Sequence, residues 1–303
     1  MDPYNAAIVN IRAVHEALRV FRVRADREPP RYCPGQYTTL GLGDWEMRCD
    51  GLQPGRFSPS ARGGHLIRRA YSISCPLLDS GGLMPCGSYD FLEFYVALVK
   101  TASDTPPTLT PRLFALDVGS RLFLGPRPRG GYTLDPVAPG DDAVFMATGT
   151  GEAPHNAMIA ELLARGHEGR IVALTSARYE GDLAYLAAHR ELEKRFPVYR
   201  YIALTTREPY NIDRTHPQYV GRRHLQEFVA SGDLEQHVGI QLDPARTHVY
   251  LCGNPAMIGA PKRDADGHLG FPEPGGMAEL LVHRGFRLDE PRRPGNIHFE
   301  RYW

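Results

Sequence analysis

The stretch Arg69-Ala70-Tyr71-Ser72 lies within residues 67–74, a run whose composition favours a β-strand. Alternation along a strand places Arg69 and Tyr71 on the same face of a sheet. A guanidinium there can bind a pyrophosphate through two hydrogen bonds, and a tyrosine ring two residues later can stack on a flat heterocycle. Ser72 can offer its hydroxyl to the edge of that ring. The tetrapeptide predicts a strand that binds a dinucleotide, although it also fits an ordinary strand with an exposed arginine.

Similar short β-compatible segments, separated by Gly and Pro turns, fill the first 138 residues of the chain. They are residues 6–15, 19–25, 36–42, 67–74, 91–100 and 121–124. Many short strands with turns between them predict an antiparallel β-barrel or sandwich. We expect a first domain over residues 1–138 that carries the dinucleotide face.

The pattern changes after Pro136-Val137-Ala138-Pro139-Gly140, a plausible linker, where strands begin to alternate with helices. Strands are predicted over 143–148, 170–176, 198–205 and 248–252, and helices over 154–165, 182–196 and 224–231. Asp182 is the expected N-cap of the second helix. This alternation predicts an α/β domain with a doubly wound parallel sheet over residues 139–303.

Thr148-Gly149-Thr150-Gly151 follows the first of these strands and opens the first helix. Unpaired N–H groups and the helix dipole at such a position favour a pyrophosphate, and the glycines let it approach the backbone. Pro154 replaces the third glycine of the usual G-x-G-x-x-G pattern, so a plain tight turn is the alternative.

Arginines follow successive strands of the predicted second domain. Arg178 ends the second strand, where an NAD enzyme more often places a carboxylate, and Arg207 and Arg222 come after the third. Three guanidiniums suit a 2′-phosphate, which favours NADPH over NADH. Each arginine alone could equally be a solvated surface charge, and Glu180 lies close to Arg178 in the sequence.

Composition and charge exclude several classes of protein. Lys plus Arg and Asp plus Glu each number 35 in 303 residues, so no overall positive field indicates nucleic-acid binding. No apolar run approaches the roughly 20 residues that cross a bilayer, and the start of the chain lacks the pattern of a signal peptide. We expect a cytoplasmic protein that binds neither nucleic acid nor membrane.

The cysteines predict neither a disulfide framework nor a metal centre. They are odd in number and have no close pair: Cys33, Cys49, Cys75, Cys86 and Cys252. Asp264-Ala265-Asp266-Gly267 resembles the start of a calcium loop, but the twelfth position is Gly275 instead of glutamate. We expect no metal site in this chain.

Taken together, these motifs make the chain similar to the bacterial-type ferredoxin/flavodoxin–NADP+ reductases, FAD-dependent members of the plant-type reductase superfamily. The resemblance covers most of the chain, with the motifs in the same order. Besides the stretches above, it rests on Pro34-Gly35-Gln36-Tyr37, Glu93-Phe94-Tyr95-Val96, Leu109-Thr110-Pro111-Arg112-Leu113, Cys252-Gly253-Asn254-Pro255 and Glu300-Arg301-Tyr302-Trp303.

The resemblance implies an FAD site in which Tyr71 stacks on the isoalloxazine and a terminal aromatic covers the flavin. The implied FAD residues are Arg69, Ala70, Tyr71, Ser72, Tyr95, Val96, Ala97, Leu98, Thr108, Leu109, Thr110, Thr150, Tyr302 and Trp303. The residues expected to bind NADP(H) are Thr150, Gly151, Ala177, Arg178, Thr206, Arg207, Arg222, Cys252, Gly253 and Asn254. The catalytic candidates are Tyr71, Ser72, Cys252 and Glu300.

The implied activity is hydride transfer between NADP(H) and FAD, coupled to one-electron exchange with ferredoxin or flavodoxin. We expect a monomer in which Tyr71 and Cys252 face a shared cleft. Two other functions stay open: an NADPH-dependent flavin or quinone reductase (diaphorase), and a non-catalytic FAD-binding electron-transfer subunit. The segments 42–66 and 259–276 are longer than in the compact bacterial members of the family. Two interpretations stay open: they form a lid or shape the surface where the carrier docks, or they are elaborations of the protein surface.

Overall fold

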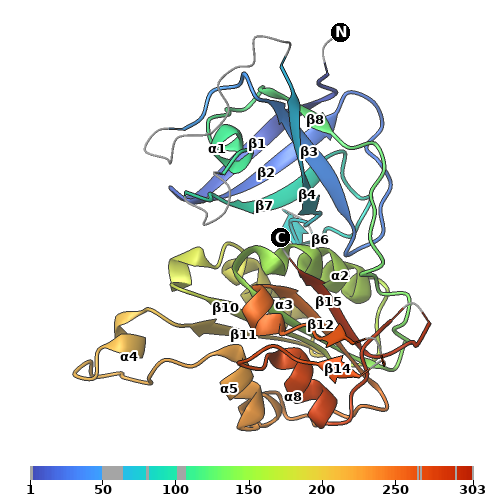
Figure 1. The fold of residues 1–303 in the computed structure, drawn as a ribbon, viewed down its shortest axis with the longest axis vertical. Helices are drawn as coiled ribbons and strands as arrows, with labels where there is room; N and C mark the ends of the chain where they lie inside the picture. The colour runs from blue at the N-terminus through green and yellow to red at the C-terminus, as the bar shows by residue number, and fades with distance from the viewer. Residues whose placement is uncertain are drawn as a thin grey trace. The chain divides into compact units, whose positions relative to one another are not determined.

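The computed structural model describes residues 3–49, 64–79, 82–100, 107–264, 266, 268–290 and 292–301. The chain divides into two compact units, Met1–Thr133 and Leu134–Trp303, called here the first and second units (Figure 1). The sequence predicted the division after residue 138, in the proline-containing segment that directly follows the boundary seen in the structure.

The first unit is a six-stranded antiparallel sheet in the order β4-β3-β8-β1-β2-β7. The strands are β1 (Ala6–His15), β2 (Leu18–Ala25), β3 (Tyr37–Gly43), β4 (Leu66–Ser72), β7 (Leu92–Ala97) and β8 (Arg121–Leu124). A bridge between Ser74 and Glu93 joins the chain beyond β4 to β7, so the two outer strands of the sheet also meet. The unit also has a short helix α1 (Thr110–Leu113) and a small hairpin, β5 (Leu78–Asp79) with β6 (Gly82–Leu83).

One face of this sheet encloses an apolar core. Alternate residues of β2 and β3 point inward, among them Phe21, Leu40 and Leu42, which are at most 1% exposed. Glu93 is also buried, and Arg22 donates a hydrogen bond to its carboxylate at 2.8 Å. The antiparallel fold predicted for the N-terminal part is confirmed.

The second unit is a five-stranded parallel sheet in the order β11-β10-β9-β12-β15. The strands are β9 (Asp142–Thr148), β10 (Ile171–Ala177), β11 (Tyr199–Thr205), β12 (Thr247–Gly253) and β15 (Ile297–Arg301). The chain runs outward from β9 to β11 on one side and resumes on the other side with β12. The strand order therefore reverses between β9 and β12, where open α/β sheets bind their ligands.

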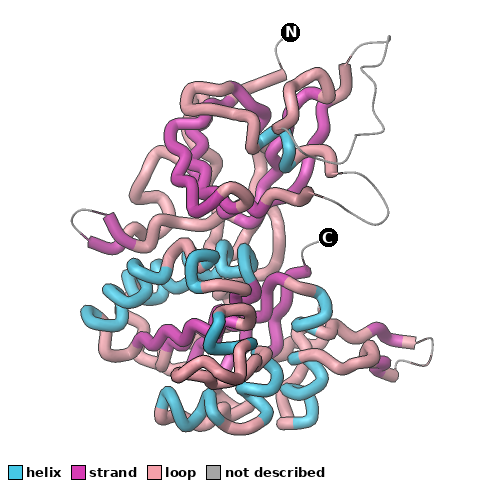
Figure 2. The backbone as a smooth tube through the Cα atoms, turned by 90° about the vertical axis from the view of Figure 1, so that its left-hand side faces the viewer, coloured by secondary structure: helices cyan, strands magenta, loops and turns pink. Residues whose placement is uncertain are grey.

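Helices cover both faces of this sheet, as Figure 2 shows, so the predicted doubly wound fold is confirmed. On one face lie α2 (Glu152–Ala164) and α3 (Leu186–Arg195), whose side chains meet Phe145 and Tyr201. The other face, with Val144 and Met146, packs against α5 (Leu225–Ala230), α6 (Asp233–Val238), α7 (Pro255–Ile258) and α8 (Met277–His283). None of the described helices is long and apolar enough to cross a membrane.

Two features of the second unit differ from the sequence prediction. The helix expected from residue 182 begins at Leu186, because Asp182 ends a 3-10 turn, Glu180–Asp182, and its carboxylate accepts a hydrogen bond from the Tyr179 N–H at 3.0 Å. The segment before the chain end, expected only as a tail, contains β15, the fifth strand of the sheet.

Candidate functional site

In the first unit, β4 presents Arg69 beside Thr108, a residue 39 positions further along the chain. The Arg69 guanidinium is exposed and donates a hydrogen bond to Thr108 Oγ1 at 3.3 Å. Arg112, which is 6% exposed, donates to the backbone oxygens of Thr108 at 2.6 Å and Asp44 at 2.8 Å. The structure thus brings together two residues predicted to contact a pyrophosphate. Arg112, to which the sequence assigned no role, holds the backbone of one of them.

The neighbours of Arg69 on β4 and α1 differ in exposure. Ala70 is exposed, Tyr71 is half-buried and Ser72 is 6% exposed. Burial raises the pKa of Tyr71 well above its ordinary value, so the phenol stays neutral. Leu109 is buried, while Thr110 begins α1 and accepts a hydrogen bond at Oγ1 from the Val99 N–H at 3.2 Å.

The backbone N–H and C=O groups of β7 point alternately toward β2 and toward the opposite edge of the strand. The Leu98 N–H donates to the Ala17 oxygen at 2.8 Å, on the β2 side. Because backbone groups alternate along an antiparallel strand, those of Val96 also point toward β2, and those of Tyr95 and Ala97 point to the opposite edge. The Glu93 oxygen accepts from the Ser74 N–H at 2.8 Å on that opposite edge.

In the second unit, the ends of β9 and β12 form one closely packed edge at the point where the strand order reverses. The Asn254 N–H donates to Thr148 Oγ1 at 2.7 Å. A Cβ on Gly151 would lie 2.4 Å from the Cys252 oxygen, and one on Gly253 would lie 2.3 Å from Thr148 Oγ1. Side chains at these two glycines would push apart the loop after β9 and the end of β12.

The loop after β9 fits a phosphate. Gly149 has φ +53°, and a Cβ there would meet nothing within 4 Å, so the backbone is open on that side. The loop, which includes half-buried Thr150, leads directly into the 13-residue helix α2. The first N–H groups of such a helix and its dipole attract anions.

Cys252 and Glu300, both catalytic candidates, are register partners on the neighbouring parallel strands β12 and β15. Cys252 is fully buried and Glu300 is half-buried. The sequence predicted both residues from separate motifs, and the pairing of β12 with β15 brings them together. Tyr302 and Trp303, predicted to cover the flavin, lie outside the described residues.

The arginines predicted to bind a 2′-phosphate lie around the ends of β10 and β11. The N–H groups of Thr206 and Arg207 donate to the Arg178 oxygen at 3.3 and 2.8 Å, and Thr206 Oγ1 donates to the Ala177 oxygen at 3.2 Å. Asn211 of α4 (Pro209–Ile212) accepts from Thr205 Oγ1 at 2.9 Å.

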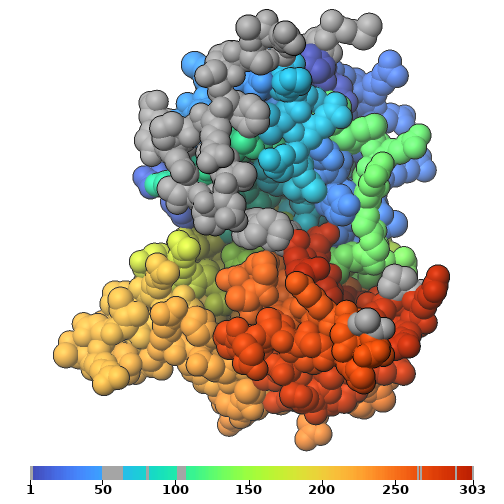
Figure 3. Space-filling model, in the orientation of Figure 1, coloured from blue at the N-terminus to red at the C-terminus, as the bar shows by residue number. Residues whose placement is uncertain are grey.

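Asn211 also connects the third arginine to this region, because its side-chain N–H donates to the oxygen of Gly221, next to Arg222, at 3.2 Å. Arg178, Arg207 and Arg222 are all exposed. Residues 206–224, called here the α4 arm, protrude from the second unit in Figure 3, coloured yellow to orange. The Glu208 carboxylate accepts a hydrogen bond from the Glu180 N–H at 2.7 Å, so a negative charge lies in the same region.

A buried network behind the phosphate loop was not found from the sequence. Glu152, 2% exposed at the start of α2, accepts hydrogen bonds at Oε1 from Thr175 Oγ1 at 3.0 Å and from the Tyr201 hydroxyl at 2.8 Å. His189 Nε2 lies 3.2 Å from the same oxygen, and His189 Nδ1 is 2.7 Å from the Tyr199 hydroxyl. An acidic residue in an otherwise apolar first turn is the signal that could have indicated this network.

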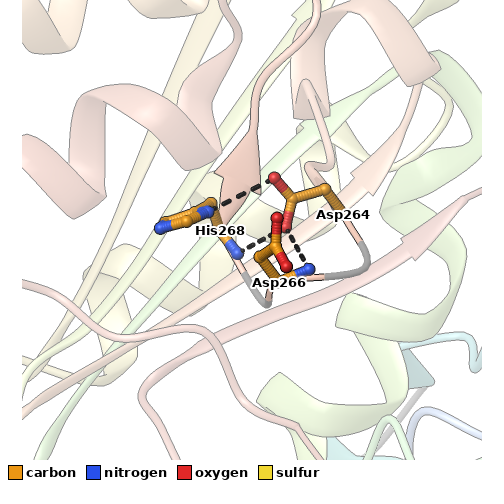
Figure 4. A group of neighbouring side chains, drawn as sticks. All are labelled: Asp264, Asp266 and His268. Carbon is orange, nitrogen blue, oxygen red and sulfur yellow. Dashed lines mark hydrogen bonds and ion pairs between the residues drawn. The ribbon is translucent and has the colours of Figure 1, made fainter.

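Asp264, Asp266 and His268 gather at the tip of a hairpin (Figure 4), where the sequence showed the start of a calcium loop. All three are exposed. Asp264 Oδ1 accepts the N–H groups of Asp266 at 3.0 Å and His268 at 2.8 Å, so the turn itself accounts for the arrangement. The cluster supports no metal assignment.

These two units define a class: a two-domain oxidoreductase in which an antiparallel unit precedes a doubly wound nucleotide-binding unit. The family model of the oxidoreductase NAD-binding domain matches residues 145–263. The chain is 31% identical over 274 residues to the flavodoxin/ferredoxin–NADP reductase of Escherichia coli (strain K12). The aligned residues cover 90% of this chain and 88% of that protein.

A second relative with the same name, from Buchnera aphidicola subsp. Schizaphis graminum, is 26% identical over 306 residues and covers 100% of both chains. The crystal structure of a ferredoxin NADP+ reductase from Neisseria gonorrhoeae with bound FAD and NADP has a TM-score of 0.70, with 20% identity over 99% of each chain, and so shares the fold. The chain belongs to the flavodoxin/ferredoxin–NADP reductase family.

Proposed function

We propose that this protein is a ferredoxin/flavodoxin–NADP+ reductase that uses FAD and NADP(H), with a small carrier protein as its one-electron partner. The observation that carries the proposal is the edge formed by residues 148–151 and 252–254 at the strand-order reversal, in a chain of this family. When bound, the flavin supplies the chemistry, because it takes up a hydride and gives up electrons one at a time.

In the first unit, Arg69 and Thr108 would hold the FAD pyrophosphate. The guanidinium already lies at hydrogen-bond distance from the threonine hydroxyl, so two donors converge on one point. Tyr71 would pack on the isoalloxazine with a phenol that burial keeps neutral, and Ser72 would offer its hydroxyl to the ring edge. The outward-facing backbone groups of Tyr95 and Ala97 would bind the remaining polar edge of FAD.

In the second unit, the loop Thr148–Gly151 would bind the pyrophosphate of NADP(H) at the start of α2. Arg178, Arg207 and Arg222 would bind the 2′-phosphate. Cys252 would lie beside the nicotinamide, and Glu300, its register partner, would influence proton and charge there. We also propose that the protein acts in the cytoplasm and is a monomer.

The test is reduction of the purified, flavin-loaded protein by NADPH without oxygen. We expect bleaching of the visible flavin bands within a turnover, followed by faster electron transfer to ferredoxin or flavodoxin than to free flavin or a quinone. A preference for free flavin or quinone would identify a diaphorase. An NADPH-insensitive flavin spectrum would identify a non-catalytic FAD-binding subunit and disprove the proposal.

A further inference from the structure

The described residues of the segment 260–275 (260–264, 266 and 268–275) form an excursion from the second unit that is closed at its base by two glycines. A Cβ on Gly259 or on Gly276 would lie 2.4 Å from the Cα of the other, so only glycines let the two backbone segments touch there. Beyond this contact, β13 (Lys262–Arg263) and β14 (Leu269–Gly270) pair as an antiparallel hairpin. These two strands and the described residues around them are called here the β13–β14 hairpin.

The β13–β14 hairpin is fixed to the loop that precedes β15. Arg263 donates from Nε and NH2 to the two carboxylate oxygens of Glu290, at 2.7 and 2.8 Å. The loop itself is closed by hydrogen bonds between Arg287 and Asn296, where the Arg287 N–H donates to Asn296 Oδ1 at 2.8 Å and the Asn296 N–H donates to the Arg287 oxygen at 2.8 Å. Both walls are thus held in place by the protein itself.

Between the hairpin and this loop lies a pocket of about 490 Å³, within the range of small-molecule sites. Its apolar lining includes Leu269, Phe286 and Leu288, of which the last two belong to the core of the unit. Its charged lining consists of Arg263, Arg287, Glu290 and Arg293. An apolar surface and guanidinium groups therefore meet in one cavity.

The charges in this pocket do not cancel. The single carboxylate, Glu290, is already paired with Arg263, and the hydrogen bonds from Arg263 lower the pKa of Glu290. The guanidiniums of Arg287 and Arg293 donate no hydrogen bond to any part of the chain that the structure describes. Arg287 and Arg293 thus lie next to an apolar surface without a hydrogen-bond acceptor, and the charge of Arg293 also helps to lower the pKa of Glu290.

We propose that this pocket is a second ligand site, separate from the predicted nucleotide positions, which binds a small anion with an apolar body. Arg287 and Arg293 would bind its carboxylate or phosphate head, since guanidinium groups match both. The apolar body would cover the half-buried side chains of Leu269 and Val282. An inorganic anion would leave that surface exposed to water, and a neutral apolar molecule would leave the two arginines without a partner.

The test is calorimetric titration of the full-length, flavin-loaded protein with decanoate, decyl phosphate and decanol. We expect both anions to bind and decanol to bind about tenfold more weakly, as for the loss of hydrogen bonds to a charged group. The tighter of the two anions identifies the head group. Saturating NADP+ should leave decanoate affinity unchanged, since the nucleotide residues lie at other strands and loops.

Variants separate the two parts of the site. Arg287→Gln and Arg293→Gln should each weaken decanoate binding roughly threefold to tenfold, and Val282→Asp, which places a negative charge in the lining, should abolish it. The matched control is Arg27→Gln, an exposed arginine of the first unit. The proposal is overturned if neither decanoate nor decyl phosphate binds, if decanol binds as tightly as the anions, if NADP+ displaces the bound anion, or if both arginine variants bind the anion like the parent protein.

Discussion

Arg178, Arg207 and Arg222 are exposed, and no described residue accepts a hydrogen bond from their guanidinium groups. The backbone contact between Arg178 and Arg207 at 2.8 Å places two of them together, and Asn211 connects the third. Guanidiniums without an internal partner are suited to a dianionic phosphate from outside the chain. The negative carboxylates of Glu180 and Glu208 oppose the positive charge of these guanidiniums. A direct measurement of the preference for NADPH over NADH therefore decides whether the arginines bind the 2′-phosphate.

Replacing Arg178 by alanine should raise the KM for NADPH about tenfold, which corresponds to a lost charged hydrogen bond of about 1.5 kcal/mol. The KM for NADH should change little, because NADH has no 2′-phosphate. Steady-state kinetics with both cofactors measure the difference. Arg292→Ala, at another exposed arginine of the second unit, is the control. An equal effect on both cofactors would remove the assignment of Arg178.

At the scale of elements, the Glu152 network joins α2, α3, β10 and β11. Its members come from distant parts of the second unit. Thr175 and Tyr201 donate hydrogen bonds to the Glu152 carboxylate, whose burial without them would be costly. The same network fixes the first turn of α2, directly after the phosphate loop. If the loop Thr148–Gly151 binds the pyrophosphate as proposed, stability and nucleotide binding depend on the same side chains.

The Tyr201→Phe variant removes one hydrogen bond to Glu152 and leaves the ring in place. We expect the free energy of unfolding of the second unit to fall by about 1–3 kcal/mol, measured by urea denaturation. Tyr219→Phe is the matched control, because Tyr219 is 41% exposed. Equal stability of Tyr201→Phe and the parent protein would show that the carboxylate does not depend on this hydroxyl.

Two buried histidines make the stability of the second unit depend on pH. Burial lowers the pKa of His155 in α2 to about 3 and that of His298 in β15 to about 4, although Asp289, 3.0 Å from His298 Nδ1, opposes the second shift. The unfolded chain takes up these protons near the ordinary histidine pKa, about 6.5, whereas the folded chain does not. Stability should therefore be lost as the pH falls from about 6.5 toward 4.

Urea unfolding at several pH values measures this slope. His155→Leu should make the decrease in stability between pH 6.5 and 4 shallower, since it removes one of the groups that take up a proton on unfolding. His283→Gln, at an exposed histidine of α8, should keep the slope of the parent protein. An unchanged slope in His155→Leu would show that His155 is not the group responsible.

At the scale of the whole molecule, most of the proposed FAD residues belong to the first unit, and the proposed NADP(H) residues belong to the second. A ligand that binds only the folded form of a unit stabilises that unit by mass action. Hydrogen exchange should therefore separate the two sites. In flavin-free protein, FAD should slow exchange in β4 and β7, and NADP+ should slow exchange in residues 148–151 and 252–254.

Adenosine 2′-phosphate should additionally slow exchange around Arg178 and in the α4 arm, whereas adenosine 5′-phosphate, the control, should not. This comparison tests the arginine site independently of turnover. Protection of the α4 arm by both nucleotides alike would mean that the adenosine, and not the 2′-phosphate, is recognised there.

The sequence by itself determined the two fold classes and the motifs, because strand and helix periodicity, glycine turns and helix starts are local properties. The pairing of distant residues was decided only by tertiary structure. Strand register places Cys252 opposite Glu300, loop packing brings Thr108 to Arg69, and the β13–β14 hairpin reaches Glu290. Each of these contacts joins segments far apart in the chain, where local pattern carries no information about which side chains will meet.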